Sequence, residues 1–191
     1  MDVDLPEVHA RSLDATRRAV AGVGPDQWER TSVCEDWTVR ELVNHVVTGN
    51  YWAFELAGGK TIEEVGNALD GDVLGTDPLR AYDDSSLVAT AVFREPGAMD
   101  QPCAVSYGPV PGSVYCGHRI IDVLVHGWDV AASTGQDTTL DADLVEACWA
   151  VVEPQLDELA GSGAFGTSVI LPDDADPQAR LLAALGRRSS Q

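Results

Sequence analysis

Apolar residues recur at helical intervals in several stretches of the chain, and the first runs from about residue 5 to residue 23. Its apolar positions are interspersed with charged residues, a pattern typical of an amphipathic surface helix. Glycine and proline between residues 22 and 25 end the pattern. His9 lies among polar residues near the start of this stretch, so we expect it to be exposed to solvent.

The second stretch has the clearest start signal. Thr38 precedes an apolar run and Glu41 follows three residues later, which is the pattern of a capping box. The helix is expected to continue to Gly58 and Gly59 and to end there. His45 lies in its middle, between leucine and valine residues. The pattern therefore predicts a long, largely buried helix that carries a histidine.

A third helix is predicted from Pro78 to about Phe93, with proline in its first turn. In residues 95–111, prolines and glycines separate short apolar pieces, which favours a loop or a hairpin. The fourth helical stretch, residues 113–134, is the most apolar of all and ends at Gly135. We expect this helix to be buried on nearly every face.

One polar row crosses that apolar helix. His118, Asp122 and His126 recur at intervals of four and therefore share one helical face, which Asp129 extends three residues later. The row lacks Lys, Glu and Gln, the usual residues of a solvated face. A buried aspartate beside histidines is costly unless it is ion-paired or binds a cation. A buried ion pair is one interpretation, and a metal site is the one we favour, because imidazole and carboxylate suit zinc, nickel and iron.

A fifth helix is predicted over about residues 141–159, where Pro154 should kink it or end it early. An acidic, proline-containing link and a short helix over 177–185 follow. The elements together predict an all-α fold, a four-helix bundle with an excursion before its fourth helix and a short C-terminal extension. We expect residues 1–160 to form the metal-binding bundle and residues 161–191 to pack on the same domain.

Charge and composition narrow the range of partners. The net charge is −19, from 31 acidic and 12 basic residues, and this repels nucleic acids and anionic membrane surfaces. With no bilayer-length apolar run and no signal-like N-terminus, the expected location is the cytoplasm. The four cysteines are widely spaced, which favours free thiols, and Cys116 is the one nearest the polar row in sequence.

His45 is the natural third ligand beside Asp122 and His126, because bundles build metal sites from residues on facing helices. Three protein ligands leave a position for water or substrate, as catalytic sites require. Asp129 is either an acceptor that orients an imidazole or a surface acid, and both readings stay open. Tryptophans are expected in the core, and some of them in the wall of a substrate cavity. The tryptophans concerned are Trp37, Trp52, Trp128 and Trp149.

Three segments resemble the DinB/YfiT-like superfamily, in particular the actinobacterial branch related to the N-terminal domain of mycothiol-dependent maleylpyruvate isomerase. They are Glu35-Asp-Trp-Thr-Val-Arg-Glu-Leu-Val-Asn-His45, Asp122-Val-Leu-Val-His-Gly-Trp-Asp-Val-Ala131 with Thr134-Gly135, and Asp176-Pro-Gln-Ala-Arg-Leu-Leu-Ala-Ala-Leu-Gly-Arg187. The resemblance implies a DinB-like four-helix bundle that holds a divalent metal. Carried over, its ligands are His45, Asp122 and His126, and His118 becomes a pocket residue or an additional ligand.

The leading functional hypothesis is a metal-dependent enzyme that uses mycothiol or a similar thiol, as an S-transferase or isomerase, on a small electrophilic metabolite. Zinc is the first expectation for the metal, with nickel and iron as alternatives. His118 or Asp129 would carry the proton as catalytic residues. A hydrolase or ring-opening enzyme that activates water is one alternative, and a non-catalytic metal- or ligand-binding module is another. Apolar outer faces of the bundle are compatible with a homodimer.

Overall fold

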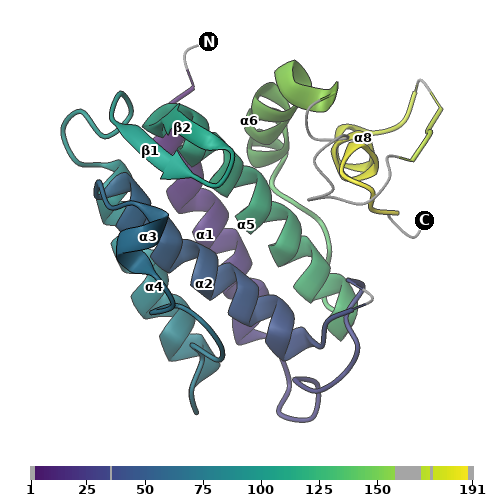
Figure 1. The fold of residues 1–191 in the computed structure, drawn as a ribbon. Helices are drawn as coiled ribbons and strands as arrows, with labels where there is room; N and C mark the ends of the chain where they lie inside the picture. Colours follow the sequence, from purple (N-terminus) through teal and green to yellow (C-terminus); the bar gives the residue numbers. More distant parts are fainter. Residues whose placement is uncertain (1–2, 35, 158–168, 173, 189–191) are drawn as a thin grey trace. The chain divides into compact units, whose positions relative to one another are not determined.

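Four long helices make the first part of the molecule, with the first and last of them running in one direction and the two between them in the opposite direction (Figure 1). The computed structural model describes residues 3–34, 36–157, 169–172 and 174–188. They divide into two compact units, residues 1–138 and 139–191, and each unit is described by itself. The expectation of a bundle over 1–160 with an extension packed on it stays a prediction.

The first unit is a helical bundle, which confirms the all-α expectation. Helix α1 packs mainly on α5 and also on α4, and α2 packs on α4 and α5. The bundle helices are α1 (Leu5–Ala21), α2 (Val39–Ala57), α4 (Pro78–Phe93) and α5 (Gly112–Thr134). Each of these ranges begins and ends within two residues of the range expected from the sequence.

Local signals account for these bounds. The Thr38 side chain accepts a hydrogen bond from the Glu41 amide and the Glu41 side chain accepts one from the Thr38 amide, so the predicted capping box is present. Asp77 caps α4 ahead of Pro78, and Gly135 ends α5 in the left-handed conformation with φ 72°. The short helix α3 (Ile62–Val65), which the weak apolar pattern did not predict, has a second capping box.

The core of the bundle is formed by aliphatic side chains from α1, α2 and α5, joined by Tyr82 from α4 and Leu74 from the loop before it. The Tyr82 hydroxyl donates to the Leu13 carbonyl oxygen across 2.9 Å, which satisfies its polar atom inside the core. The main buried members are Leu13, Val20, Leu42, Val43, Val46, Val47, Leu74, Tyr82, Val123 and Val130. Helices α2 and α5 are thereby fixed with their polar rows close together.

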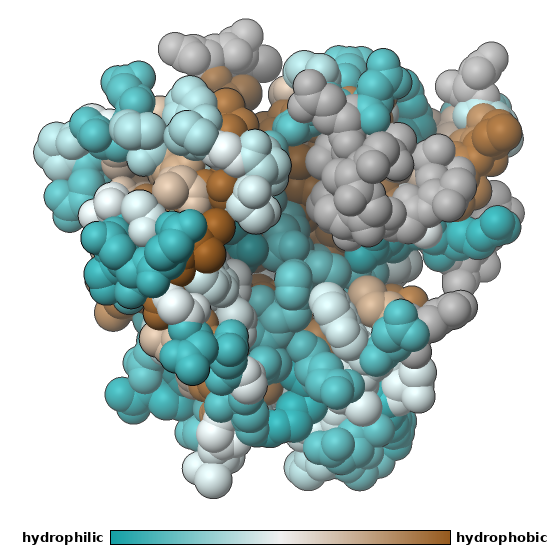
Figure 2. Space-filling model, in the orientation of Figure 1, coloured by the Kyte–Doolittle hydropathy of each residue, from teal (hydrophilic) through white to brown (hydrophobic). Residues whose placement is uncertain are grey.

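The excursion before α5 is a hairpin. Strand β1 (Pro102–Val105) pairs antiparallel with β2 (Gly108–Pro111), and Cys103 lies opposite Val110. Figure 1 shows the hairpin at the end of the bundle where α5 begins. Figure 2 shows mainly hydrophilic residues on the surface at the opposite end, over the first turns of α2 and α4 and the loops beside them. Of the loop and the hairpin predicted for residues 95–111, the structure thus shows the hairpin.

His9 contradicts its sequence-based expectation. Its side chain is fully buried, with the ring edge-on to Phe93 at 5.0 Å between centroids. Helix α1 is covered on two sides, by α4 and by α5, so its buried face is wider than the apolar residues alone indicate. Among the described residues neither ring nitrogen of His9 has a hydrogen-bond partner.

The second unit contains α6 (Ala142–Val152), the 3₁₀ turn η1 (Glu153–Gln155) and α8 (Pro177–Ala184). As predicted, the helix gives way to a tighter turn at Pro154. Helix α8 packs on α6, and the Arg180 guanidinium lies over the Trp149 ring at 5.3 Å. The end of the predicted fifth helix at 158–159 and most of the link after it lie outside the described residues. Within the described ranges, no helix combines the length and apolar character needed to cross a bilayer.

Candidate metal centre

Facing turns of α2 and α5 bring three metal-ligand side chains together. His45 comes from the second turn of α2, and Asp122 and His126 come from successive turns of α5. The Asp122 Oδ1 atom lies 3.2 Å from His45 Nε2 and 3.5 Å from His126 Nε2. One donor atom from each residue lies within 4.8 Å of the others. The structure therefore assembles the same three residues that the sequence singled out.

The spacing of these donor atoms suits a small divalent cation. Ligand atoms about 2.0–2.1 Å from a tetrahedral zinc ion are themselves about 3.3 Å apart. The observed separations of 3.2 and 3.5 Å between the carboxylate oxygen and the imidazole nitrogens are close to this value. Two imidazoles and one carboxylate also form an established type of zinc ligand set. The residues present thus fit the metal that the sequence predicts.

Asp129 fixes the orientation of the His126 ring. Its Oδ2 atom lies 2.9 Å from His126 Nδ1, and both side chains are buried. A proton on Nδ1 donated to Asp129 leaves the Nε2 lone pair directed toward Asp122, as a metal ligand requires. Of the two readings of Asp129, the structure favours the acceptor that orients an imidazole over the surface acid. Its proposed catalytic role stays a prediction.

The charges around His126 favour a positive charge on or beside its imidazole ring. Burial alone lowers the pKa of His126, but the Asp122 charge and the hydrogen bond to Asp129 outweigh burial and raise the pKa to about 9. Burial alone raises the pKa of Asp122, but the charges of Arg119 and His126 bring it well below its usual range. The surroundings of Asp122 thus favour its charged carboxylate paired with a positive charge, either on a protonated His126 or on a metal ion.

Solvent reaches the site from the α2 side. The His45 side chain is 38% exposed, whereas that of His126 is 7% exposed. The Trp37 ring lies beside both imidazoles, at 4.8 Å from His45 and 6.1 Å from His126 between ring centroids. Trp37 therefore forms a wall of the site, as expected for one of the tryptophans, and a small molecule can approach past His45.

Cys34 was not foreseen as a neighbour of the site. Its Sγ atom lies 3.4 Å from Asp129 Oδ2, so Cys34, His126 and Asp129 form a second group with metal-ligand chemistry. This group shares His126 with the first group, but uses the other side of the imidazole ring. The loop before α2 places Cys34 there, and only residues distant in sequence could have revealed the contact.

Cys116, nearest the row in sequence, is fully buried, and burial raises the pKa of its thiol to about 12. All four cysteines lie in the described residues and none of them forms a disulfide, as expected. His118 does not join the three-donor group. Its Nδ1 atom lies 2.6 Å from the hydroxyl oxygen of Tyr107, in the turn of the hairpin. The hairpin thus supplies a residue that the sequence did not connect with the polar row.

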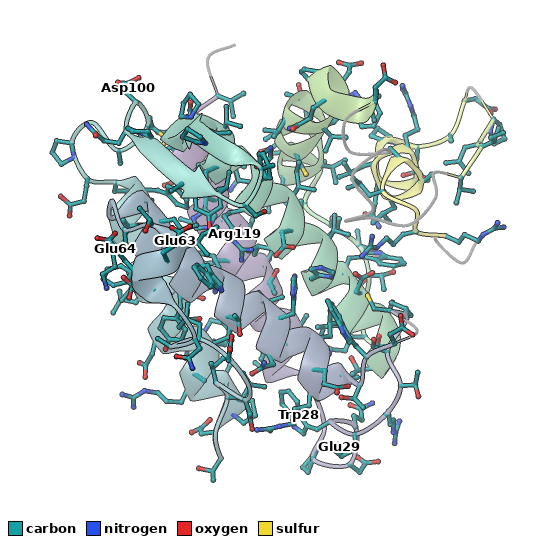
Figure 3. The ribbon with its side chains drawn as sticks, viewed as in Figure 1. Trp28, Glu29, Glu63, Glu64, Asp100 and Arg119 are labelled. Atoms are coloured by element: carbon teal, nitrogen blue, oxygen red, sulfur yellow. The ribbon has the colours of Figure 1, made fainter. Side chains whose placement is uncertain are left out.

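Arg119 is a further unpredicted member of the site. It lies among the bundle helices between α2 and α5 (Figure 3), is only 6% exposed, and donates from Nη1 to Asp122 Oδ2 at 2.8 Å. Arg119 lies three residues before Asp122, and helical periodicity indicates that two such residues can contact each other. A lone arginine in a strongly apolar helix was the available clue.

Comparison with known proteins identifies the family of this chain. The family described as the mycothiol maleylpyruvate isomerase N-terminal domain matches residues 9–131, a range that includes His45, Asp122, His126 and Asp129. The chain belongs to this family. Two uncharacterized proteins of Mycobacterium tuberculosis, from strains CDC 1551 and H37Rv, are each 35% identical over 184 residues. These alignments cover 94% of this chain and 95% of each relative.

The fold is also found in solved structures. The crystal structure of the mycothiol-dependent maleylpyruvate isomerase is similar with a TM-score of 0.65 and 19% sequence identity, over 90% of this chain and 78% of that one. A histidine-to-alanine variant of that isomerase gives a TM-score of 0.64 with the same identity and coverage. At this identity the likeness concerns the fold, and it confirms the DinB-like bundle that the sequence segments implied.

Proposed function

We propose that the protein is a divalent-metal-dependent enzyme that activates a low-molecular-weight thiol, mycothiol or a close analogue, for attack on a small electrophilic metabolite. The reaction class is S-transfer or thiol-assisted isomerisation. The observation that carries the proposal is the convergence of His45, Asp122 and His126 on a position open to solvent at His45. The family membership supports the choice of a thiol as co-substrate.

In this proposal, the nucleophile comes from the co-substrate. Cys103, Cys116 and Cys148 are fully buried, and burial raises the pKa of each thiol, to about 12 for the latter two. These thiols stay protonated at neutral pH and lie inside the fold. His45, Asp122 and His126 would hold zinc or a similar cation. Such a cation would lower the pKa of a thiol bound at its remaining coordination position.

Other residues of the chain would hold the ligands and move the proton. Asp129 keeps the His126 ring in the orientation that presents Nε2. His118, one helical turn before Asp122 and 2.6 Å from the Tyr107 hydroxyl through Nδ1, is proposed to exchange a proton with the substrate. Trp37 would cover the imidazoles and limit access of water.

Metal content tests the ligand assignment. We expect the purified protein to bind zinc stoichiometrically and the variants His45→Ala, Asp122→Asn and His126→Ala to lose at least about a hundredfold in zinc affinity, because each removes a direct ligand. Cys34→Ser is the matched control, since it belongs only to the second group and should keep normal affinity. Mass spectrometry for metals and titration against a competing chelator provide the measurement.

The pattern of loss discriminates between the two groups. Loss of zinc in Cys34→Ser, with zinc retained in His45→Ala, would move the metal to the Cys34 group. Full zinc content in His126→Ala would remove both assignments.

Thiol binding tests the reaction class. We expect mycothiol to raise the melting temperature of the zinc-loaded protein, whereas its S-methyl derivative, which cannot become a thiolate, should have little effect. The same titration in His126→Ala controls for binding elsewhere. Turnover with a panel of electrophiles then separates an enzyme from a binding module. Hydrolysis without any thiol would favour the water-activating alternative.

A further inference from the structure

The most unusual feature beside the candidate ligands is a buried cation. The Arg119 side chain is 8% exposed, and its Nη1 atom donates to Asp122 Oδ2 across 2.8 Å. Burying an arginine costs free energy unless it is paired and hydrogen-bonded. Figure 3 shows the side chain within the bundle, away from the exposed outer faces.

Neighbouring residues are arranged around the guanidinium. Gly49 on α2 leaves the space it occupies, because a Cβ atom there would lie 2.3 Å from Nη1. The Nη2 atom donates to Asn50 Oδ1 at 3.1 Å, and Asn50 Nδ2 donates to Ser85 Oγ at 3.1 Å. This buried chain links α4, α2 and α5 and ends on the candidate metal-binding carboxylate. Residues of three helices thus fix the position of the Arg119 guanidinium.

Because of Arg119, the two carboxylate oxygens of Asp122 have different partners. Oδ2 of Asp122 accepts from Arg119, whereas Oδ1 lies near both histidines, at 3.2 Å from His45 and 3.5 Å from His126. A cation held by the histidines therefore meets a single oxygen of Asp122. Coordination by one oxygen leaves more of the metal open to other ligands than coordination by two.

Arg119 changes the charge of the loaded site as well. A divalent cation, the two carboxylates of Asp122 and Asp129, and two neutral imidazoles are together neutral. The arginine makes the total positive by one. In a chain whose net charge is −19, this local excess is what would attract an anion.

We propose that Arg119 is a positioning residue that restricts Asp122 to one-oxygen coordination and gives the loaded site its affinity for a small anion, such as a thiolate or a carboxylate. This inference rests on the proposed metal site. The role is assigned from geometry and charge, because the Arg119 guanidinium donates to the candidate ligand Asp122, to the Val46 carbonyl oxygen and to Asn50.

The test uses Arg119→Met, which keeps an unbranched apolar stem but removes the charge, and Arg119→Lys, which keeps the charge. The exposed Arg18 on α1 gives the matched control, Arg18→Met. Each protein is loaded with cobalt(II), and its visible absorption reports the coordination number. Azide is then titrated into the cobalt protein as a probe anion. Circular dichroism checks that the helices are retained.

We expect Arg119→Met to keep cobalt but to bind azide about tenfold more weakly, with a weaker visible absorption as Asp122 adds its second oxygen. Arg119→Lys should restore most of the azide affinity, and Arg18→Met should match the original protein. Gly49→Ala, which displaces the guanidinium without deleting it, should act in the same direction as Arg119→Met if the latter does not fold.

Two outcomes would overturn the inference, and they are distinguishable. An Arg119→Met protein that holds cobalt with unchanged absorption and azide affinity within twofold of the original would overturn it alone. An original protein that binds no cobalt or zinc would overturn the proposed metal site and this inference together.

Discussion

Single residues decide how this bundle handles charge. His9 is buried against Phe93 without a hydrogen-bond partner among the described residues, while Arg119 is buried with Asp122 as its partner. The first is tolerated because an imidazole can be neutral, and the second because its charge is compensated. Both lie inside the same bundle, and the positive charge of Arg119 further disfavours a proton on His9.

His9 predicts a specific loss of stability in acid. Burial, and then the charges of Arg119 and Arg94, lower the pKa of His9 from 6.5 to about 3. Because the unfolded chain takes up the proton first, stability is complete above pH 6.5 and falls as the pH drops toward 3. We expect this residue to cost about 2 kcal/mol between pH 7 and pH 5.

Urea denaturation of the original protein and of His9→Phe at pH 7, 6 and 5 measures this contribution. The difference in unfolding free energy between the two proteins should shift in favour of the variant as the pH falls. Carboxylates and the other histidines titrate in both proteins and therefore cancel. Parallel pH profiles would show that His9 is not the source.

At the scale of elements, the close approach of α1 and α5 sets the geometry of the site helix. A Cβ atom on Gly127 would lie 2.2 Å from Thr16 Oγ1 and 3.0 Å from Thr16 Cα. The Thr16 hydroxyl also donates to the Val123 carbonyl oxygen at 2.8 Å. Gly127 directly follows His126, so a shift at this contact would move a candidate ligand.

Gly127→Ala should therefore destabilise the protein, although alanine favours helices. We expect a net loss of about 1–2 kcal/mol, because the clash with α1 exceeds the gain of about 1 kcal/mol in helix propensity. Thermal and urea unfolding provide the measurement. The double variant with Thr16→Ala should recover part of the loss, and a Gly127→Ala protein of increased stability would contradict the close packing.

At the scale of the whole molecule, the net charge of −19 opposes the local charge at the site. The long-range repulsion of anions is screened by salt, with a Debye length of about 30 Å at 0.01 M and about 8 Å at 0.15 M. The attraction at the metal acts over shorter distances and is screened less. An anionic ligand should thus bind this acidic protein more tightly when salt is added.

Azide binding to the cobalt-loaded protein tests this expectation. We expect affinity to rise about twofold or more between 0.01 M and 0.15 M of a weakly coordinating salt. Imidazole, a neutral ligand at pH 8, is the control and should bind independently of salt. A steady fall of azide affinity with salt would show that the local positive charge dominates instead.

The sequence by itself determined the local structure and the spacing of two of the three candidate ligands, Asp122 and His126. Capping at Thr38 and Glu41, the end of α5 at Gly135 and the four-residue spacing of Asp122 and His126 depend on backbone hydrogen bonds between near neighbours. Tertiary structure decided the rest. It placed His45 opposite Asp122 as the sequence had hypothesised, and it paired Tyr107 with His118, a contact that the sequence did not indicate.

The contacts that only the fold revealed have one cause. Periodicity shows that a helix has a polar row or an apolar face, but it does not show which face of another helix lies opposite. The loop before α2 places Cys34 beside Asp129, Gly49 leaves room for the Arg119 guanidinium, and α4 and α5 enclose His9. Packing of segments far apart in sequence made each of these contacts, so the tertiary structure alone decided the charge and the neighbours of the site.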